Sequence, residues 1–260
     1  MSPATSHPPA HDEAPAAFSF DAAAAQMECM LRDLGRVYRE RNEALQEVAR
    51  AHHDALFRLA LAAEYRDDDT GAHIVRMGYL AERLAMLAGQ TPEWAAMLRK
   101  AAPMHDVGKI GIPDGVLKKP GSFTPEERAV MNRHPEIGAG ILGQSRIPLF
   151  QLAAEVALSH HERWDGSGYP AGLSGAAIPL AGRLVAVVDF FDALTMDRCY
   201  RVAFSDEQAL QMLSAEAGRA FDPDLVALFL LHAQTMVALR NDINQRQPSF
   251  ADLAADAAGL

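Results

Sequence analysis

Five histidines and two aspartates of this chain have the residue types and surroundings of metal ligands. Each histidine continues an apolar stripe at helical spacing, where residues three or four apart share one face. These histidines are His73, His105, His134, His160 and His161. Asp106 directly follows His105, and Asp189 lies in the apolar run LVAVVDFF. The other histidines lack such surroundings, and we predict ordinary structural roles for them.

Several inward-facing imidazoles and a buried carboxylate are costly unless something shared accepts their lone pairs. A metal ion does this, because neutral imidazole is a good ligand for zinc, iron, manganese or nickel. One ion with an open coordination position needs about three or four protein ligands. Seven ligands therefore predict two ions, and Asp106 is the candidate bridge between them.

The elements that must position these residues are predicted to be helices, which makes the chain all-α. Thr91-Pro92 and the segment TPEE at 124–127 are helix-start signals, the second a capping box. Helices are expected over 148–162 and 223–240. The run LVAVVDFFDAL fits a buried strand or a buried helix, and its helical surroundings favour a helix.

Composition divides the chain into four parts. Residues 1–20 are rich in proline and alanine and predict a disordered leader. Residues 21–62 predict a long helix, residues 63–240 one all-α domain, and residues 241–260 a tail. Apolar residues of the long helix follow a seven-residue register that includes Leu31, Leu34, Tyr38, Leu45 and Val48. Two interpretations stay open: a helix packed on its own domain, or a coiled-coil homodimer and signalling helix.

The bulk composition excludes some classes of protein. The chain has 260 residues, 49% apolar and 22% charged, with a formal net charge of -10. This charge argues against nucleic-acid binding, which needs clustered Lys and Arg. Cys29 and Cys199 form neither a disulfide framework nor a zinc-type spacing. No uncharged apolar run is long enough for a membrane span, so we expect a cytoplasmic protein.

Two motifs carry a family resemblance. HDVGK at 105–109 resembles the signature of the HD phosphohydrolase superfamily, and HHERWDGSGYP at 160–170 resembles the GYP element of the HD-GYP family. The blocks RDDDTGAHIVR at 66–76 and VVDFFDALTMDRCYR at 187–201 extend the resemblance over about residues 60–235. The resemblance implies an HD-superfamily helical bundle, with an HD-GYP domain at 63–240.

The resemblance also implies roles for individual residues. One metal would be bound by His73, His105, Asp106 and Asp189, and a second by Asp106, His134, His160 and His161. A third ion is held by a glutamate in some members, and Asp69 stands at that position here. Iron or manganese is the usual family metal. Lys109 and Asp106 would act in catalysis, and Tyr169, Arg198 and Arg201 would contact substrate. Lys118, Arg183 and Asp192 are further candidates for substrate contacts, while Met196 and Cys199 depart from the family pattern.

The implied function is metal-dependent hydrolysis of cyclic di-GMP to pGpG, GMP or both, in bacterial signalling. Two alternatives stay open. One is an HD phosphohydrolase for another cyclic dinucleotide, such as cyclic GMP-AMP. The other is a cyclic dinucleotide receptor that binds signalling partners without turnover.

Overall fold

The computed structural model describes residues 20–64, 66, 72–197, 202–248 and 252–253. These residues form α-helices and short 3-10 helices with no strand among them, which confirms the predicted all-α class. The elements are α1 (Phe20–Glu64), α2 (Ala72–Leu87), α3 (Pro92–Ala101), η1 (Ala102–Met104), η2 (Val107–Gly111), α4 (Asp114–Leu117), α5 (Pro125–Met131), α6 (His134–Leu142), α7 (Pro148–Ser159), η3 (Gly175–Ala177), α8 (Leu180–Leu194), α9 (Asp206–Ala215), α10 (Pro223–Leu231) and α11 (Ala233–Arg246).

The chain divides into two compact units, Met1–Ala49 and Arg50–Leu260, and the boundary falls inside α1. In the first unit, none of residues 20–49 is buried. The second unit contains the hydrophobic core. None of the helices in the described part of the chain combines the length and the apolar character that a membrane crossing requires.

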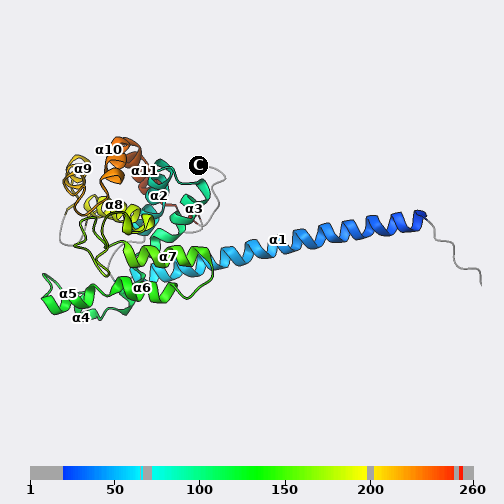
Figure 1. Ribbon diagram of the computed structural model, residues 1–260, viewed down its shortest axis with the longest axis horizontal. Coiled ribbons are helices and arrows are strands. Elements are labelled where there is room, and N and C mark those ends of the chain that lie inside the picture. The colour runs from blue at the N-terminus through cyan, green and yellow to red at the C-terminus, as the bar shows by residue number, and fades with distance from the viewer. Residues whose placement is uncertain (1–19, 65, 67–71, 198–201, 249–251, 254–260) are drawn as a thin grey trace, which may run out of the picture. The chain divides into compact units, whose positions relative to one another are not determined.

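The core of the second unit is built around α8, which packs against α2 and α7; α3 packs against both α2 and α7, and α6 packs against α7 (Figure 1). Leu80 and Leu84 of α2 and Val187 and Phe191 of α8 are fully buried. The run LVAVVDFFDAL is therefore a helix, as its surroundings indicated. It is apolar on nearly every side because neighbouring helices cover it, and this removes the usual amphipathic signal.

Helix ends follow the sequence signals where a capping side chain is present. Thr91 accepts a hydrogen bond from the N–H of Trp94, and Thr124 and Glu127 form the predicted capping box. Two predicted helices were wrong in extent. The helix expected over 148–162 ends at Ser159, and the one expected over 223–240 is two helices separated at His232. Neither the end at Ser159 nor the break at His232 carries a proline or glycine, so the local sequence gave no signal for either boundary.

The segment that follows the HD pair lies directly on the backbone of α6. A Cβ atom on Gly108 would be 1.9 Å from the carbonyl oxygen of His134 and 2.5 Å from the amide nitrogen of Gly138. Only glycine allows two backbones to approach this closely. The contact therefore sets the distance between the HD pair and His134.

We expect Gly108→Ala to destabilise the protein by ~1–3 kcal/mol or to displace η2, because backbone atoms cannot yield as a flexible side chain can. Gly140→Ala is the matched control, since a Cβ there meets nothing within 4 Å and the residue lies inside α6. That control should be neutral or slightly stabilising. Urea unfolding measures both, and equal midpoints for the two variants would contradict the close contact.

Candidate metal centre

Six of the seven predicted ligands lie at the ends of helical elements that meet in the bundle. A side chain at a helix end can project beyond the last turn, so several helices can direct ligands to one point. His73 lies in the first turn of α2, and His134 is the first residue of α6. His105 is the C-cap of η1, Asp106 is the N-cap of η2, and His160 is the C-cap of α7, with His161 next in the chain. Asp189 is the exception, because it lies inside α8.

The structure brings these residues together in two groups. In each group the candidate ligand atoms lie within 4.8 Å of one another. The Asp106 group comprises Asp106, His134, His160 and His161, and the His73 group comprises His73, His105 and Asp189. The groups adjoin, since the rings of His105 and His160 have centroids 5.2 Å apart. All seven predicted ligands are thus neighbours, and each group could hold a metal ion.

The carboxylate of Asp106 lies between the two groups. Its Oδ2 is 3.2 Å from Nε2 of His105 and 2.8 Å from Nζ of Lys109. Its Oδ1 is 3.2 Å from Nε2 of His134 and 3.7 Å from Nε2 of His160. One oxygen thus faces each group, which is the arrangement a bridging carboxylate requires.

Three histidines are oriented by the same local bond. Nδ1 of His105, His134 and His160 lies 3.0, 2.8 and 3.0 Å from the carbonyl oxygen three residues earlier. A carbonyl can only accept, so Nδ1 carries the hydrogen and Nε2 keeps its lone pair. Each of these carbonyls lies in the last turn of a helix, where it can accept from a side chain, and that of Ala102 also accepts the backbone N–H of His105.

Buried lone pairs without protein partners support a metal at this site. Within the described residues, Nε2 of His134, Nε2 of His160 and Oδ1 of Asp106 have no hydrogen-bond partner, although all three atoms are buried. Such atoms are costly unless a ligand satisfies them. Imidazole nitrogens and a carboxylate oxygen form a donor set that suits a divalent transition metal.

The protonation states also suit metal binding. Burial lowers the pKa of His160, and burial together with His160 lowers the pKa of His161 well below its ordinary value. Both rings are therefore neutral near neutral pH, the form in which imidazole binds a metal. Burial alone would raise the pKa of Asp106, but Lys109 and His105 outweigh it and hold that pKa well below its usual range.

His73 is oriented by a side chain instead of a carbonyl. Its Nδ1 lies 2.7 Å from Oδ2 of Asp192, a fully buried residue. Arg76 donates to both oxygens of Asp192, at 2.7 and 3.1 Å, and to Oδ1 of Asn244 on α11 at 3.0 Å. Asp192, which was expected among the substrate contacts, thus contacts and orients the candidate ligand His73. Sequence reasoning missed Arg76 and Asn244 altogether, although RDDDTGAHIVR ends on Arg76.

The loop after His161 carries Tyr169 to the Asp106 group. The Tyr169 ring stacks on His161 with centroids 4.8 Å apart. The backbone N–H of Tyr169 donates to the backbone carbonyl of His161. Glu162, which sequence reasoning also missed, is buried and accepts the N–H groups of Ala171 and Leu173 at 2.7 and 2.9 Å. Burial, with Asp106 nearby, raises the pKa of Tyr169, so its phenol stays protonated and can donate.

The remaining predicted substrate residues are placed less centrally. Lys118 is exposed at the end of α4. Arg183 donates to the carbonyl of Ile178 at 2.9 Å and to Asp222 at 2.6 Å, which engages its guanidinium in holding local structure. Asp69, Arg198, Cys199 and Arg201 lie outside the described residues. Met196, where the sequence departs from the family pattern, contacts Arg76 through its sulfur.

Fold and site together define an all-α domain with a histidine–aspartate cluster that could hold metal ions. The sequence profile of the HD domain family matches residues 30–225, so the chain belongs to this family. Together with the HD and GYP elements, this match confirms the predicted membership of the HD-GYP branch.

Relatives of known name cover most of the described domain. The 3'3'-cGAMP-specific phosphodiesterase 2 of Vibrio cholerae is 46% identical over 72% of this chain and 36% of its own length. The cyclic di-GMP phosphodiesterase response regulator RpfG of Xanthomonas campestris is 48% identical over 72% of this chain and 50% of its own. A cyclic di-GMP phosphodiesterase of Thermotoga maritima is 46% identical over 66% of this chain and 47% of its own length. The matched part of this chain thus spans half or less of the length of each of these relatives.

The fold has a counterpart among solved structures. The crystal structure of a cyclic GMP-AMP specific phosphodiesterase of Vibrio cholerae, V-cGAP3, superposes with a TM-score of 0.55 over 80% of this chain and 55% of that chain. Its sequence identity is 22%, so this likeness concerns the fold alone.

We expect Asp192→Asn to weaken metal binding by the His73 group ~10- to 100-fold, because an amide has only one acceptor oxygen and no negative charge, so it cannot accept the bond of His73 together with both bonds of Arg76. Titration with cobalt(II), followed by its visible absorption, measures this. Asp206→Asn is the control, since Asp206 of α9 also receives two bonds from an arginine, Arg240, and belongs to neither ligand group. Equal cobalt affinity in both variants would contradict a positioning role for Asp192.

Proposed function

We propose that this protein is a metal-dependent phosphodiesterase that hydrolyses cyclic di-GMP to pGpG, and onward to GMP, in bacterial second-messenger signalling. The expected compartment is the cytoplasm. The observation that carries the proposal is the Asp106 carboxylate, which directs one oxygen towards each histidine group. Two adjoining ligand groups that share a carboxylate are typical of two-metal phosphoesterases.

We assign two divalent ions, iron or manganese, to the site. His73, His105, Asp106 and Asp189 would hold one ion, and Asp106, His134, His160 and His161 the other. Asp69 remains the candidate ligand for a third. When bound, such ions supply a nucleophile derived from water near neutral pH and offset charge on the phosphoryl group.

The other residues of the site supply charge and orientation. The Lys109 ammonium lies 2.8 Å from Asp106 and is partly exposed, so it can reach a phosphoryl oxygen and offset its developing negative charge. The protonated Tyr169 can donate to the substrate or stack on a base. Arg198, Arg201 and Lys118 remain proposed substrate contacts. Arg183 and Asp192 position other groups, because their charges are already engaged.

Cyclic GMP-AMP is the second candidate substrate. It is favoured by one specific observation: relatives named for cyclic GMP-AMP and for cyclic di-GMP are almost equally similar to this chain, at 46% and 48% identity. A receptor without turnover is the less favoured alternative, because all seven predicted ligands are present and adjacent.

Protein purified anaerobically with iron or manganese should contain about two ions per chain and convert cyclic di-GMP to pGpG or GMP. Cyclic GMP-AMP is assayed in parallel, and a higher kcat/KM for it would transfer the proposal to that substrate.

Asp106→Ala should lose both metal and turnover, whereas Asp54→Ala, at an exposed ion pair on α1, should keep both. Dinucleotide binding by metal-loaded protein without turnover would favour the receptor, and an active Asp106→Ala variant would refute the bridge.

We also propose that residues 20–49 of α1 form a parallel coiled coil with a second copy of this chain. Leu31, Leu34, Tyr38, Leu45 and Val48 follow the heptad register, and each is more than half exposed. An isolated helix without a buried face is marginal in water, and a matching apolar stripe on a second copy would cover this one.

The double variant Leu34→Glu, Leu45→Glu should shift the protein from dimer to monomer in sedimentation equilibrium, because both substitutions place charges in the seam. The control variant Ala25→Glu, Gln46→Glu adds the same charges outside the register and should remain dimeric. A monomeric wild-type protein would refute this interface.

A further inference from the structure

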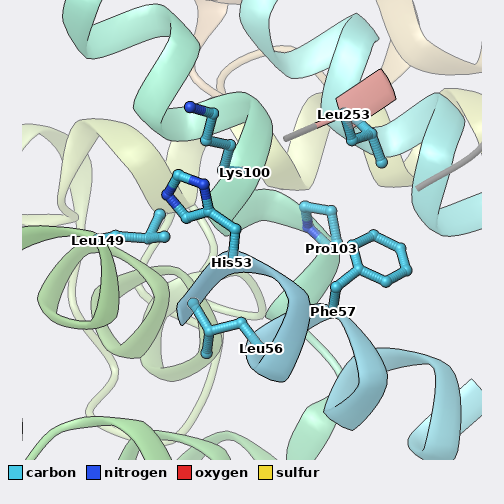
Figure 2. A pocket seen from close by; sticks show the side chains of 7 residues that line it. All are labelled: His53, Leu56, Phe57, Lys100, Pro103, Leu149 and Leu253. Atoms are coloured by element: carbon cyan, nitrogen blue, oxygen red, sulfur yellow. The ribbon is translucent and has the colours of Figure 1, made fainter. Parts of the chain in front are cut away.

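The base of α1 contacts the chain on both sides of the His105–Asp106 pair. Before the pair, Leu56 and Phe57 of α1 line one small cavity together with Pro103 of η1. Figure 2 shows the Phe57 ring extending from α1 beside Pro103. After the pair, Arg66 reaches η2 from a position two residues beyond the end of α1. One helix thus adjoins both flanks of the motif.

Arg66 makes the contact with η2 through both terminal nitrogens of its guanidinium group. Nη1 donates to the carbonyl oxygen of Ile110 and, at 3.4 Å, to that of Lys109. Nη2 donates to the carbonyl of Ile112 at 3.0 Å and pairs with the Asp114 carboxylate at 2.5 Å. The planar guanidinium presents its donors in a fixed fork, so these acceptors are held in one arrangement.

Two of these bonds satisfy carbonyl groups at the end of a short 3-10 helix, those of Ile110 and Ile112, while the Lys109 carbonyl also accepts the N–H of Ile112. The last carbonyls of any helix lack intrahelical partners, and η2 is only five residues long, Val107–Gly111. Arg66 supplies the missing donors from 43 to 46 residues earlier in the chain. It therefore acts as a side-chain cap of η2, in addition to the backbone N–H of Ile112, which bonds the carbonyl of Lys109.

The cap bears directly on Lys109. Lys109 lies inside η2, and its ammonium is the one that contacts Asp106 at 2.8 Å. On its other side η2 is held against α6 by the close approach at Gly108. The position of Lys109 thus depends on two contacts, one with the rigid α6 and one with Arg66 at the base of α1.

The base of α1 is itself anchored in the core. Leu56, Ala60 and Ala63 are almost completely buried, and the Arg66 N–H bonds the carbonyl of Ala63 at 3.1 Å. A rotation or shift of this helix would therefore carry Arg66 with it. The segment RDDDTGAHIVR begins with Arg66, and none of the roles assigned to the site uses this residue.

We propose that Arg66 is a positioning residue that fixes Lys109 beside Asp106, and that displacement of the α1 base regulates catalysis through it. A signal that arrives along α1 would change turnover by moving η2 while leaving the metal ligands in place. This inference rests on the proposed phosphodiesterase activity, with the metal-loaded full-length protein as the system that tests it.

Arg66→Ala should lower kcat ~10- to 100-fold, since a displacement of about 1 Å can cost that much, with KM and metal content close to wild type. Arg66→Lys should recover part of kcat, because one ammonium can reach a carbonyl but cannot fork across several. Asp114→Asn should have little effect, since it removes only an exposed ion pair and leaves the carbonyl bonds. Arg58→Ala, at an exposed pair on the same helix, is the control for a change in α1 itself.

Hydrogen–deuterium exchange gives a readout that does not need activity. Arg66→Ala should speed exchange of the amides at 107–112 without changing those of α9 and α10. Wild-type kcat in Arg66→Ala, loss of metal in that variant, or unchanged exchange at 107–112 would each overturn the proposal. A wild-type protein without turnover would refute the proposed function, and the exchange experiment would then decide the capping role of Arg66 by itself.

Discussion

The carboxylate of Asp106, buried among imidazole rings, is the constraint on which the rest of the structure depends. A buried charge is tolerated only where opposite charges and lone-pair acceptors surround it. Lys109 provides the charge at 2.8 Å, and two histidine groups lie on either side of the carboxylate. The glycine contact between η2 and α6 brings His134 near this carboxylate, and the ends of α2, η1 and α7 bring the other rings. The packing of the bundle can be understood as the support for this one position.

Orientation of the rings follows from where each histidine lies in its helix. His105, His134 and His160 each follow a helical turn, so a carbonyl of that turn lies three residues earlier and accepts from the ring. His73 lies in the first turn of α2, and its Nδ1 contacts a side chain instead. Asp192 takes that role, supported by Arg76 and Asn244. This support extends to α11, beyond residue 225, where the match to the HD domain profile ends.

The loop that carries Tyr169 and the base of α1 bear on the site by different means. Tyr169 stacks directly on the candidate ligand His161, in a loop that the buried Glu162 holds through two backbone bonds. Arg66 does not touch a candidate ligand, and it acts on the backbone that carries Lys109. A contact with backbone can move a catalytic side chain without changing the coordinating atoms. This separation would allow turnover to change while the metals stay bound.

The sequence by itself determined the all-α class, the capping signals at Thr91 and Thr124, and the candidate ligands, because these depend on residue type and on spacing of a few residues. Local reasoning missed the helix break at His232. The family resemblance placed Asp192 among the substrate contacts, and Arg66 received no role. Those features depend on contacts between residues far apart in the chain, 119 positions for His73 and Asp192 and 46 for Arg66 and Ile112. Local periodicity carries no information about such pairs. Only the packing of the bundle decided which side chain faces the metal centre and which one holds another side chain in place.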